Sequence, residues 1–200
     1  TSRMLRVGIM GQGRSGRNIH AEFLKDDPRF EIVAVADLLP DRRERAEREY
    51  GCATYQDVAD LLARKDLDLV VNALPSHLHA PVTLQGLEAG QNMLCEKPLA
   101  RRAAEVDALI AASERQGRLL AIFQQSRFAP YFVKIREVIA SGVLGRIVAI
   151  KIRFNGYARR WDWQTLQEYA AGSLLNTGPH PLDQALQLLA YDGMPSVWCK

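Results

Sequence analysis

The sequence predicts an α/β fold, with a doubly wound parallel sheet over residues 1–125 and the start of a second, α+β domain over residues 126–200. Three observations support this prediction. Short apolar runs alternate with segments of helical periodicity up to about residue 125. A glycine-rich turn follows the first apolar run, and an aspartate ends the second. After residue 125 the regular alternation stops, which places the domain boundary there.

The apolar runs of the first domain predict strands, and the segments between them predict helices. We expect strands at 5–10, 30–36, 68–73, 92–95 and 118–123, and helices at 18–26, from residue 40 through the charged run 41–49, and at 57–63, 78–89 and 101–116. In the second domain we expect helices at 131–140 and 178–190, separated by a loop rich in Trp and Tyr at 155–169 and a glycine-containing turn. Residues 146–154 alternate apolar and polar from Ile150 onward, which predicts a strand buried on one face, and 195–199 predict the start of another.

Composition excludes several classes of protein. The net charge of +3 comes from 26 basic and 23 acidic residues, a balance that excludes a nucleic-acid footprint. Cys52, Cys95 and Cys199 lie far apart without ligand spacing, so we expect neither a disulfide framework nor a metal site. There is no signal-peptide pattern and no run of roughly 18 apolar residues. We therefore expect a cytoplasmic protein with no nucleic-acid or membrane partner.

The turn after the first strand has the spacing of a dinucleotide-binding Rossmann turn. Gly11 permits the tight turn, Gly13 lets the backbone approach a pyrophosphate, and Gly16 lets the following helix pack closely. The residues between these glycines belong to the same expected cofactor site, and they are Gln12, Arg14 and Ser15. The alternative is a glycine turn that binds nothing.

Asp37 ends the second strand 21 residues after Gly16. A carboxylate at this place accepts hydrogen bonds from the adenosine ribose hydroxyls and repels a 2′-phosphate. It predicts NAD as the cofactor rather than NADP, although Arg42 or Arg43 nearby could soften this preference. In the alternative interpretation, Asp37 only caps the next helix.

Lys97 follows the fourth apolar run and precedes a proline. Because the carboxyl ends of parallel strands meet at one rim, we expect the residues just beyond them to lie together, namely Gly11, Asp37, Pro75, Lys97 and Gln124. A lysine at this rim can donate or accept a proton if burial or a neighbouring positive charge lowers its pKa. On residue type alone, an ordinary surface lysine is the better interpretation. The expected cofactor contacts at the rim are Pro75, His79, Glu96 and Lys97.

Five segments resemble, in order, the Gfo/Idh/MocA family of glucose-fructose oxidoreductase, inositol dehydrogenase and rhizopine-catabolism proteins. They are the turn at 11–16, VAVAD at 33–37, Glu96 to Ala100, Arg127 with Phe128, and Gly178 to Asp183. The resemblance implies an NAD(P)-dependent oxidoreductase acting on a sugar, a polyol or a related cyclic compound. It also implies that the second domain has a large, open, mostly antiparallel sheet that binds substrate and forms a homo-oligomer.

The same resemblance assigns roles to individual residues. Lys97 and His180 would be catalytic, with His180 taking the hydroxyl proton while Lys97 orients the oxygen. The substrate would contact Asn176, Asp183, Arg127 and Trp163. Three of these residues have a structural alternative. A histidine near a helix start, such as His180, often only caps or packs, Asp183 could be purely structural, and a Trp in a loop, such as Trp163, often packs beneath a sheet.

Two departures from the family pattern bear on function. Catalytic members usually carry an aspartate four residues before the histidine, where this chain has Asn176, and an amide supplies no negative charge to the imidazole. Family members also continue for several strands beyond this length, so we expect the second domain to be incomplete. These departures keep an alternative function open, a dinucleotide-binding sensor or regulatory protein without catalysis.

Overall fold

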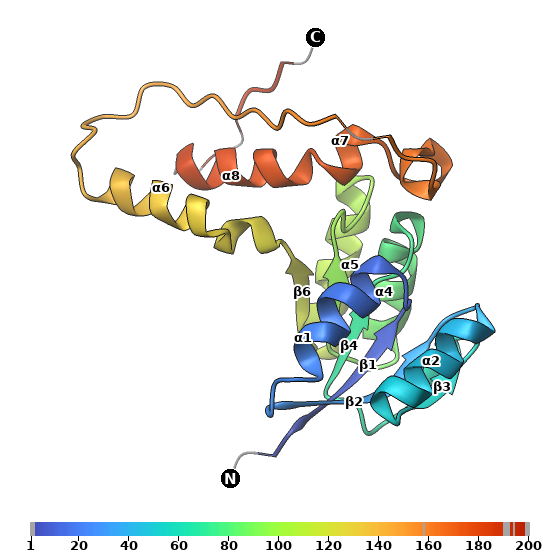
Figure 1. Ribbon diagram of the computed structural model, residues 1–200. Coiled ribbons are helices and arrows are strands. Elements are labelled where there is room, and N and C mark those ends of the chain that lie inside the picture. The colour runs from blue at the N-terminus through green and yellow to red at the C-terminus, as the bar shows by residue number, and fades with distance from the viewer. Residues whose placement is uncertain (1–2, 158, 190–192, 194, 199–200) are drawn as a thin grey trace.

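One parallel sheet organises the first region of the protein (residues 3–125). The computed structural model describes residues 3–157, 159–189, 193 and 195–198. The strands are β1 (Leu5–Met10), β2 (Phe30–Ala36), β3 (Ala53–Tyr55), β4 (Leu69–Asn72), β5 (Met93–Glu96) and β6 (Leu120–Phe123). They lie in the order β3-β2-β1-β4-β5-β6, and every neighbouring pair is parallel (Figure 1). This is the doubly wound Rossmann order, which confirms the predicted fold of this region.

Helices cover both faces of the sheet. They are the π-helical η1 (Gly16–Ala21), α1 (Glu22–Leu24), α2 (Pro40–Tyr50), α3 (Val58–Leu62), the 3₁₀ turn η2 (Ser76–Leu78), α4 (His79–Glu88) and α5 (Ala103–Gln116). On one face, Val7 and Ile9 of β1, both fully buried, join a cluster of buried residues with η1, α1 and α2. On the other, Met10 and Val70 join a second cluster with α3, α4 and α5. Burial on both faces explains why these strands read as continuous apolar runs.

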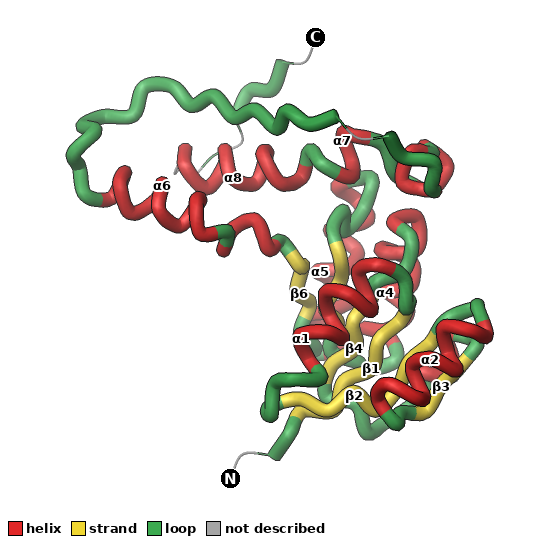
Figure 2. The backbone as a smooth tube through the Cα atoms, viewed as in Figure 1, coloured by secondary structure: helices red, strands yellow, loops and turns green. Residues whose placement is uncertain are grey.

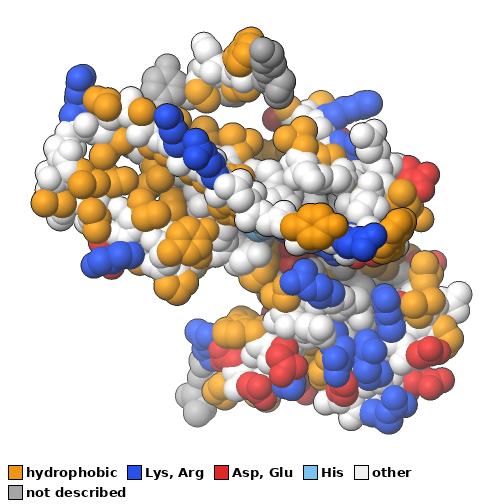
Figure 3. Space-filling view, turned by 45° about the horizontal axis from the view of Figure 1, so that its top comes forward, with side chains coloured by type: hydrophobic (Ala, Val, Ile, Leu, Met, Phe, Trp, Pro, Cys, Tyr) orange, Lys and Arg blue, Asp and Glu red, His pale blue; other side chains and the backbone are white. Residues whose placement is uncertain are grey.

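The second region (residues 126–198) is built from helices and loops. Its elements are η3 (Gln125–Phe128), α6 (Pro130–Ala140), the 3₁₀ turns η4 (Trp163–Thr165) and η5 (Gln167–Tyr169), α7 (Ser173–Asn176) and α8 (Pro179–Leu189). A long loop runs from α6 to η4, passing over α8 in the view of Figure 2. Large apolar side chains stay exposed here, and Figure 3 shows orange side chains gathered over this part of the molecule.

The predicted strand at 146–154 is wrong, because the described residues of the second region contain no strand and no antiparallel sheet. The alternation from Ile150 is real, but a strand forms only where a neighbour completes its hydrogen bonds. No extended partner lies beside 146–154 in the part of the chain that the structure describes. Residues 195–198 also lack regular structure, and Cys199 lies outside the described residues.

Elsewhere in the chain, the sequence predictions differ from the structure mainly at element ends. The strands predicted at 5–10 and 30–36 are confirmed at both bounds. Two short elements are not predicted from the sequence, namely β3, which has three residues, none of them fully buried, and α7, a four-residue helix inside the predicted turn. The helix predicted at 18–26 is a π-helical turn followed by a short α-helix.

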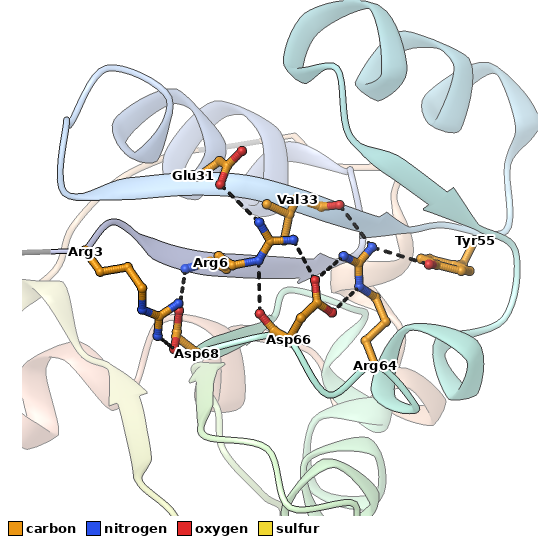
Figure 4. Close-up of polar contacts among 8 residues, drawn as sticks. All are labelled: Arg3, Arg6, Glu31, Val33, Tyr55, Arg64, Asp66 and Asp68. Carbon is orange, nitrogen blue, oxygen red and sulfur yellow. Dashed lines mark hydrogen bonds and ion pairs between the residues drawn. The ribbon is translucent and has the colours of Figure 1, made fainter.

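An ionic network closes the amino ends of β1 and β4, opposite the rim where a ligand is expected. Figure 4 shows Asp66 between two arginines. Its carboxylate accepts from Arg6 Nη2 at 2.6 Å and from Arg64 Nε and Nη2 at 2.9 and 2.6 Å. Asp68 accepts from the Arg6 backbone N–H at 2.7 Å. These hydrogen bonds hold the pKa of Asp66 below its usual range, and those from Arg64 have the largest effect.

Three further sequence predictions concern metals, cysteines and membranes. The residues that the structure describes include no cluster of His, Cys, Asp and Glu able to hold a metal ion. Cys52 and Cys95 are buried and unpaired with each other. No described helix has the length and apolar character needed to cross a membrane.

Candidate functional site

A cavity of about 550 Å³ lies at the carboxyl ends of β1, β2, β4 and β5. The first region lines it with the glycine turn, the residues after β2 and β4, and the end of β5. The second region adds five residues, namely Arg160, Asp162, Trp163, Gln164 and Tyr169, together with Asn176 of α7. Most of the residues predicted to meet at this rim do so, since Gly11, Asp37, Pro75 and Lys97 all line the cavity.

The glycine turn is shaped by close backbone contacts. Gly11 has φ of +88°, and a Cβ there would lie 2.7 Å from the carbonyl oxygen of Ala73. A Cβ on Gly16 would lie 1.8 Å from the Gly11 carbonyl oxygen, so the helix can begin beneath the turn only with glycine. Gly13 differs, because a Cβ there would meet nothing closer than Arg42 Nη1 at 3.7 Å. Bare backbone at Gly13 therefore faces open space in the cavity wall, where an anion can approach it.

Asp37 is nearly buried and already has partners in the protein. Its Oδ2 accepts from the Gln12 backbone N–H at 2.7 Å, and its Oδ1 accepts from the Leu39 backbone N–H at 2.9 Å. Arg42 Nη1 lies 3.3 Å from Oδ2. Asp37 thus ties the glycine turn to the start of α2, and it also lines the cavity. The Gln12 side chain is buried and is not among the cavity-lining residues, whereas Arg14 and Ser15 are.

Lys97 is half-buried at the cavity wall and contacts Asn176 of α7. Its Nζ donates to Asn176 Oδ1 at 3.1 Å and to the Asn176 carbonyl oxygen at 2.9 Å. Burial lowers the pKa of Lys97 from its ordinary value, and Arg14 and Arg160 lower it further, while the negative charge of Glu96 opposes them. The two oxygens are neutral, so they orient the ammonium without adding a charge.

His180 lies at the start of α8, half-buried, and is not among the cavity-lining residues. Burial lowers its pKa, and the positive charge of Lys97 lowers it further. Its Nδ1 is buried and has no hydrogen-bond partner among the described residues. A neutral imidazole with a free ring nitrogen can accept a proton, but its access from the cavity stays a prediction.

Arg127 and Asp183 form a salt bridge with each other. Arg127 Nε lies 3.0 and 2.9 Å from the two Asp183 oxygens, and Nη2 lies 2.6 Å from Oδ1. The pair joins η3 to α8, and neither residue lines the cavity. The substrate contacts assigned to them stay a prediction, and the contact that the structure does give them is structural. Gln124 of the predicted rim likewise joins α8, by donating to the Pro179 carbonyl oxygen at 2.7 Å.

His79 braces two loops at the rim. It is buried, its Nδ1 lies 2.7 Å from the Pro98 carbonyl oxygen, and its Nε2 lies 2.8 Å from that of Leu74. Burial lowers its pKa, although both carbonyls oppose this effect. The neutral ring has one N–H and donates to one of these carbonyl oxygens, and the protonated ring donates to both, so His79 links the loops after β4 and β5.

Sequence reasoning missed an aromatic wall of the cavity. The ring of His77 meets that of Tyr169 edge-on, with centroids 4.8 Å apart, and Tyr169 lies 6.2 Å from Trp163. Trp163 had been predicted as a substrate contact, whereas the other two had not. The enrichment of Trp and Tyr in 155–169 was the available signal, but it could not tell which rings face the cavity.

Family models match both parts of the chain. The Gfo/Idh/MocA oxidoreductase family model, described as an NAD-binding Rossmann fold, matches residues 5–124. The model of the Gfo/Idh/MocA C-terminal domain matches residues 132–197.

Individual relatives are similar over almost the whole of this chain. D-glucoside 3-dehydrogenase of Escherichia coli is 33% identical, with 98% of this chain and 57% of that protein covered. The scyllo-inositol 2-dehydrogenase (NADP(+)) of Bacillus subtilis is 28% identical, with 96% and 53% covered. The solved structure of GenD2 from gentamicin A biosynthesis in complex with NAD has a TM-score of 0.88 and 28% identity, with 94% and 54% covered. The chain thus spans about half the length of the curated relatives it matches.

Proposed function

Because the chain belongs to the Gfo/Idh/MocA family of NAD-binding oxidoreductases, we propose that it transfers hydride between a nicotinamide dinucleotide and a sugar, a polyol or a related cyclic hydroxyl or carbonyl compound. The relatives that act on a glucoside and an inositol support this substrate class. The observation that supports the activity most is the position of Lys97, which lines the same cavity as the glycine turn.

The residues present fit a dinucleotide. The bare backbone of Gly13 accommodates a pyrophosphate, and the start of the helix beneath it adds backbone N–H donors. When bound, the nicotinamide ring supplies or accepts the hydride. The remaining rim residues that we assign to cofactor contact are Arg14, Ser15, Asp37, Pro75 and Glu96.

Lys97 binds and orients the reacting oxygen of the substrate in this proposal. An ammonium group has three N–H donors, and two of them are directed to Asn176. The third is left for a substrate oxygen, whose developing negative charge it stabilises. His180, with its lowered pKa and free Nδ1, receives the hydroxyl proton in the oxidative direction.

For the cofactor, we propose a preference for NAD over NADP. The Asp37 carboxylate at the rim repels a 2′-phosphate, while Arg42 beside it offsets part of that repulsion. Calorimetric titration with both coenzymes tests this preference. We expect Asp37→Ser to reduce the difference between the affinities for NAD and NADP. Tighter binding of NADP by the unaltered protein would contradict it.

The test of the activity is a panel of sugars and polyols with the full-length protein, followed by the absorbance of the reduced coenzyme. We expect Lys97→Met to reduce kcat by about a hundredfold or more, the scale of positioned proton-transfer and charge-stabilising groups, with little change in coenzyme affinity. Lys134→Met, at an exposed lysine of α6, is the matched control and should leave both unchanged. Tight coenzyme binding with no turnover of any panel member would favour the sensor instead.

We also propose that residues 1–125 form the dinucleotide-binding domain and residues 126–200 the start of the substrate domain. The two family matches, at 5–124 and 132–197, support this division. Formation of a homo-oligomer through the sheet of the second domain stays a prediction, because the described residues contain no such sheet.

A further inference from the structure

Two buried ionisable side chains contact each other, and one of them belongs to the residue that precedes Lys97. The activity proposed above does not use this contact. His20 of η1 and Glu96 of β5 are each 5% exposed. His20 Nε2 lies 3.0 Å from Glu96 Oε1, although 76 residues separate them in the chain. The His20 ring also meets Phe123 at the end of β6 edge-on, with centroids 4.5 Å apart. The ends of two neighbouring strands, β5 and β6, therefore meet this imidazole of η1.

The direction of the hydrogen bond follows from the chemistry of the pair. An ionised carboxylate only accepts hydrogen bonds, so His20 must donate from Nε2. A buried carboxylate needs such donors because its charge is costly away from water. Among the described residues, the other donor to Glu96 is the Lys97 backbone N–H, 3.3 Å from Oε2. One oxygen of Glu96 thus faces His20 and the other faces the backbone of Lys97.

We propose that His20 is a positioning residue, which holds the Glu96 carboxylate beside the backbone of Lys97 by donating a hydrogen bond from Nε2. The proposal rests on the proposed function in one respect, because Lys97, whose ammonium the Glu96 charge acts on, is the residue to which that function assigns a role. Without the donor, the carboxylate would turn away, and its charge would no longer act on the ammonium.

Several charges act on Lys97, and they oppose one another. Glu96 alone raises its pKa, against burial, Arg14 from the glycine turn and Arg160 from the loop before η4. The remaining titratable groups coupled to Lys97 are His79 of α4 and His180 of α8. Glu96 raises the pKa of both histidines as well. Loss of the Glu96 charge should therefore lower the pKa of Lys97 further.

The test measures the protonation of Lys97 directly, in the full chain and without coenzyme or substrate. Acetic anhydride reacts only with an unprotonated amine, so the pH dependence of Lys97 acetylation, read by peptide mass spectrometry, reports its pKa. Exposed Lys134 in the same sample is the internal control. Three variants are compared, namely His20→Phe, which keeps a ring against Phe123 but has no donor, His20→Gln, whose amide can replace the donor, and Glu96→Gln, which removes the charge.

We expect His20→Phe and Glu96→Gln to shift the Lys97 profile to lower pH, with acetylation rising on the order of threefold at a pH below its pKa. His20→Gln should restore the profile of the unaltered protein, and the double variant of His20→Phe with Glu96→Gln should add nothing to either single change. A folded His20→Phe protein with an unchanged profile would show that His20 only packs. If His20→Phe does not fold, His20→Met replaces it, since methionine adapts to irregular space.

This experiment separates the inference from the proposed activity. Lack of turnover with every sugar and polyol would count against the activity and leave the acetylation result intact. An unmoved profile in a folded variant without the donor would overturn the role of His20, whatever the enzyme does. In an active protein, the pH dependence of kcat should contain a step that reports the titration of Lys97. In the variants, this step should shift in the same direction as the acetylation profile.

Discussion

The two regions of the molecule bury their apolar side chains to different extents. In the first region, β1 alone contributes Val7, Ile9 and Met10, none of which has exposed surface. In the second, Phe132 of α6 is the only large apolar side chain that is fully buried among the described residues. Leu174, Leu182 and Trp161 of the same region are 83%, 61% and 91% exposed.

The difference shows how each region is held in place. The first region has its own core on both faces of a sheet, and hydrophobic burial stabilises it. The second meets the first through polar contacts, from Lys97 to Asn176 and from Gln124 to Pro179, and through the rings of His77 and Tyr169. Spectroscopy can separate them, because all three tryptophans lie in the second region. Tryptophan fluorescence therefore reports the second region directly, with Trp163 at the cavity that both regions line.

The largest effect should come from the core of the first region. Ile9→Ala removes a fully buried side chain from the central strand and should lower the free energy of unfolding by about 2–5 kcal/mol. Leu174→Ala, at a side chain that is 83% exposed, should change it by less than about 0.5 kcal/mol. Urea unfolding followed by circular dichroism measures both. Equal losses of unfolding free energy in the two variants would mean that the core of the second region contributes as much stability as that of the first.

A smaller effect is expected at Gln184, the buried polar residue of α8. Its Nε2 donates to the Ser126 carbonyl oxygen at 3.1 Å and to the Tyr131 hydroxyl at 2.7 Å. Gln184→Leu leaves both oxygens without this donor, at a cost of about 1–3 kcal/mol. The loss should appear in the fluorescence transition, and Gln187→Leu, at an exposed position of the same helix, should show none. A shift of the main circular dichroism transition by the same amount would indicate that the two regions unfold together.

The contrast between the regions also explains what the sequence could predict. Strands β1 and β2 agree with the prediction at both ends because their apolar runs stop at Gly11 and Asp37, which mark strand ends on their own. The alternation after Ile150 is also a local strand pattern, but it has no such end marker, and no strand forms there. Whether such a segment becomes a strand depends on a neighbour, which the local pattern does not contain.

The candidate site was predictable to the extent that topology determines it. The parallel sheet brings the glycine turn, Asp37 and Lys97 to one rim, and the sequence was sufficient for that. It could not show that Lys97 meets Asn176, since 79 residues separate them and the contact depends on how the second region packs. Nor did it indicate His20, whose partner Glu96 lies at the end of a distant strand.

The salt bridge between Arg127 and Asp183 should contribute less than Gln184. The Arg127 side chain is 46% exposed, so water and salt screen the pair, and about 0.5–1 kcal/mol is expected. At low ionic strength, Asp183→Asn should lower the urea midpoint of the unfolding transition that is followed by tryptophan fluorescence. The difference in midpoint from the unaltered protein should shrink as salt is added. Glu137→Gln, which breaks the local pair with Lys134 within α6, serves as the matched control because this pair joins no two elements of the fold. Loss of catalytic turnover without any loss of stability would instead support the substrate contact predicted for Asp183.

The smallest effect concerns Asp66 at the opposite end of the sheet. Because Arg64 and Arg6 hold its pKa below the ordinary carboxyl range, the folded protein binds this proton less readily than the unfolded chain does. Its contribution to stability is therefore fully present above the unfolded pKa of about 4 and is lost as the pH falls through the folded pKa. The side chain is 45% exposed, so screening limits the contribution to less than about 1 kcal/mol.

Asp66→Asn should therefore weaken the first region near neutral pH and make its unfolding less sensitive to acid. Unfolding followed by circular dichroism at several pH values measures the change, whereas the fluorescence of the second region should not respond. The pKa of Asp162 is lowered in the same way by Arg160, so Asp162→Asn should affect the fluorescence signal instead. A response of both signals to either variant would mean that the regions are thermodynamically coupled, despite the few buried apolar contacts in the second.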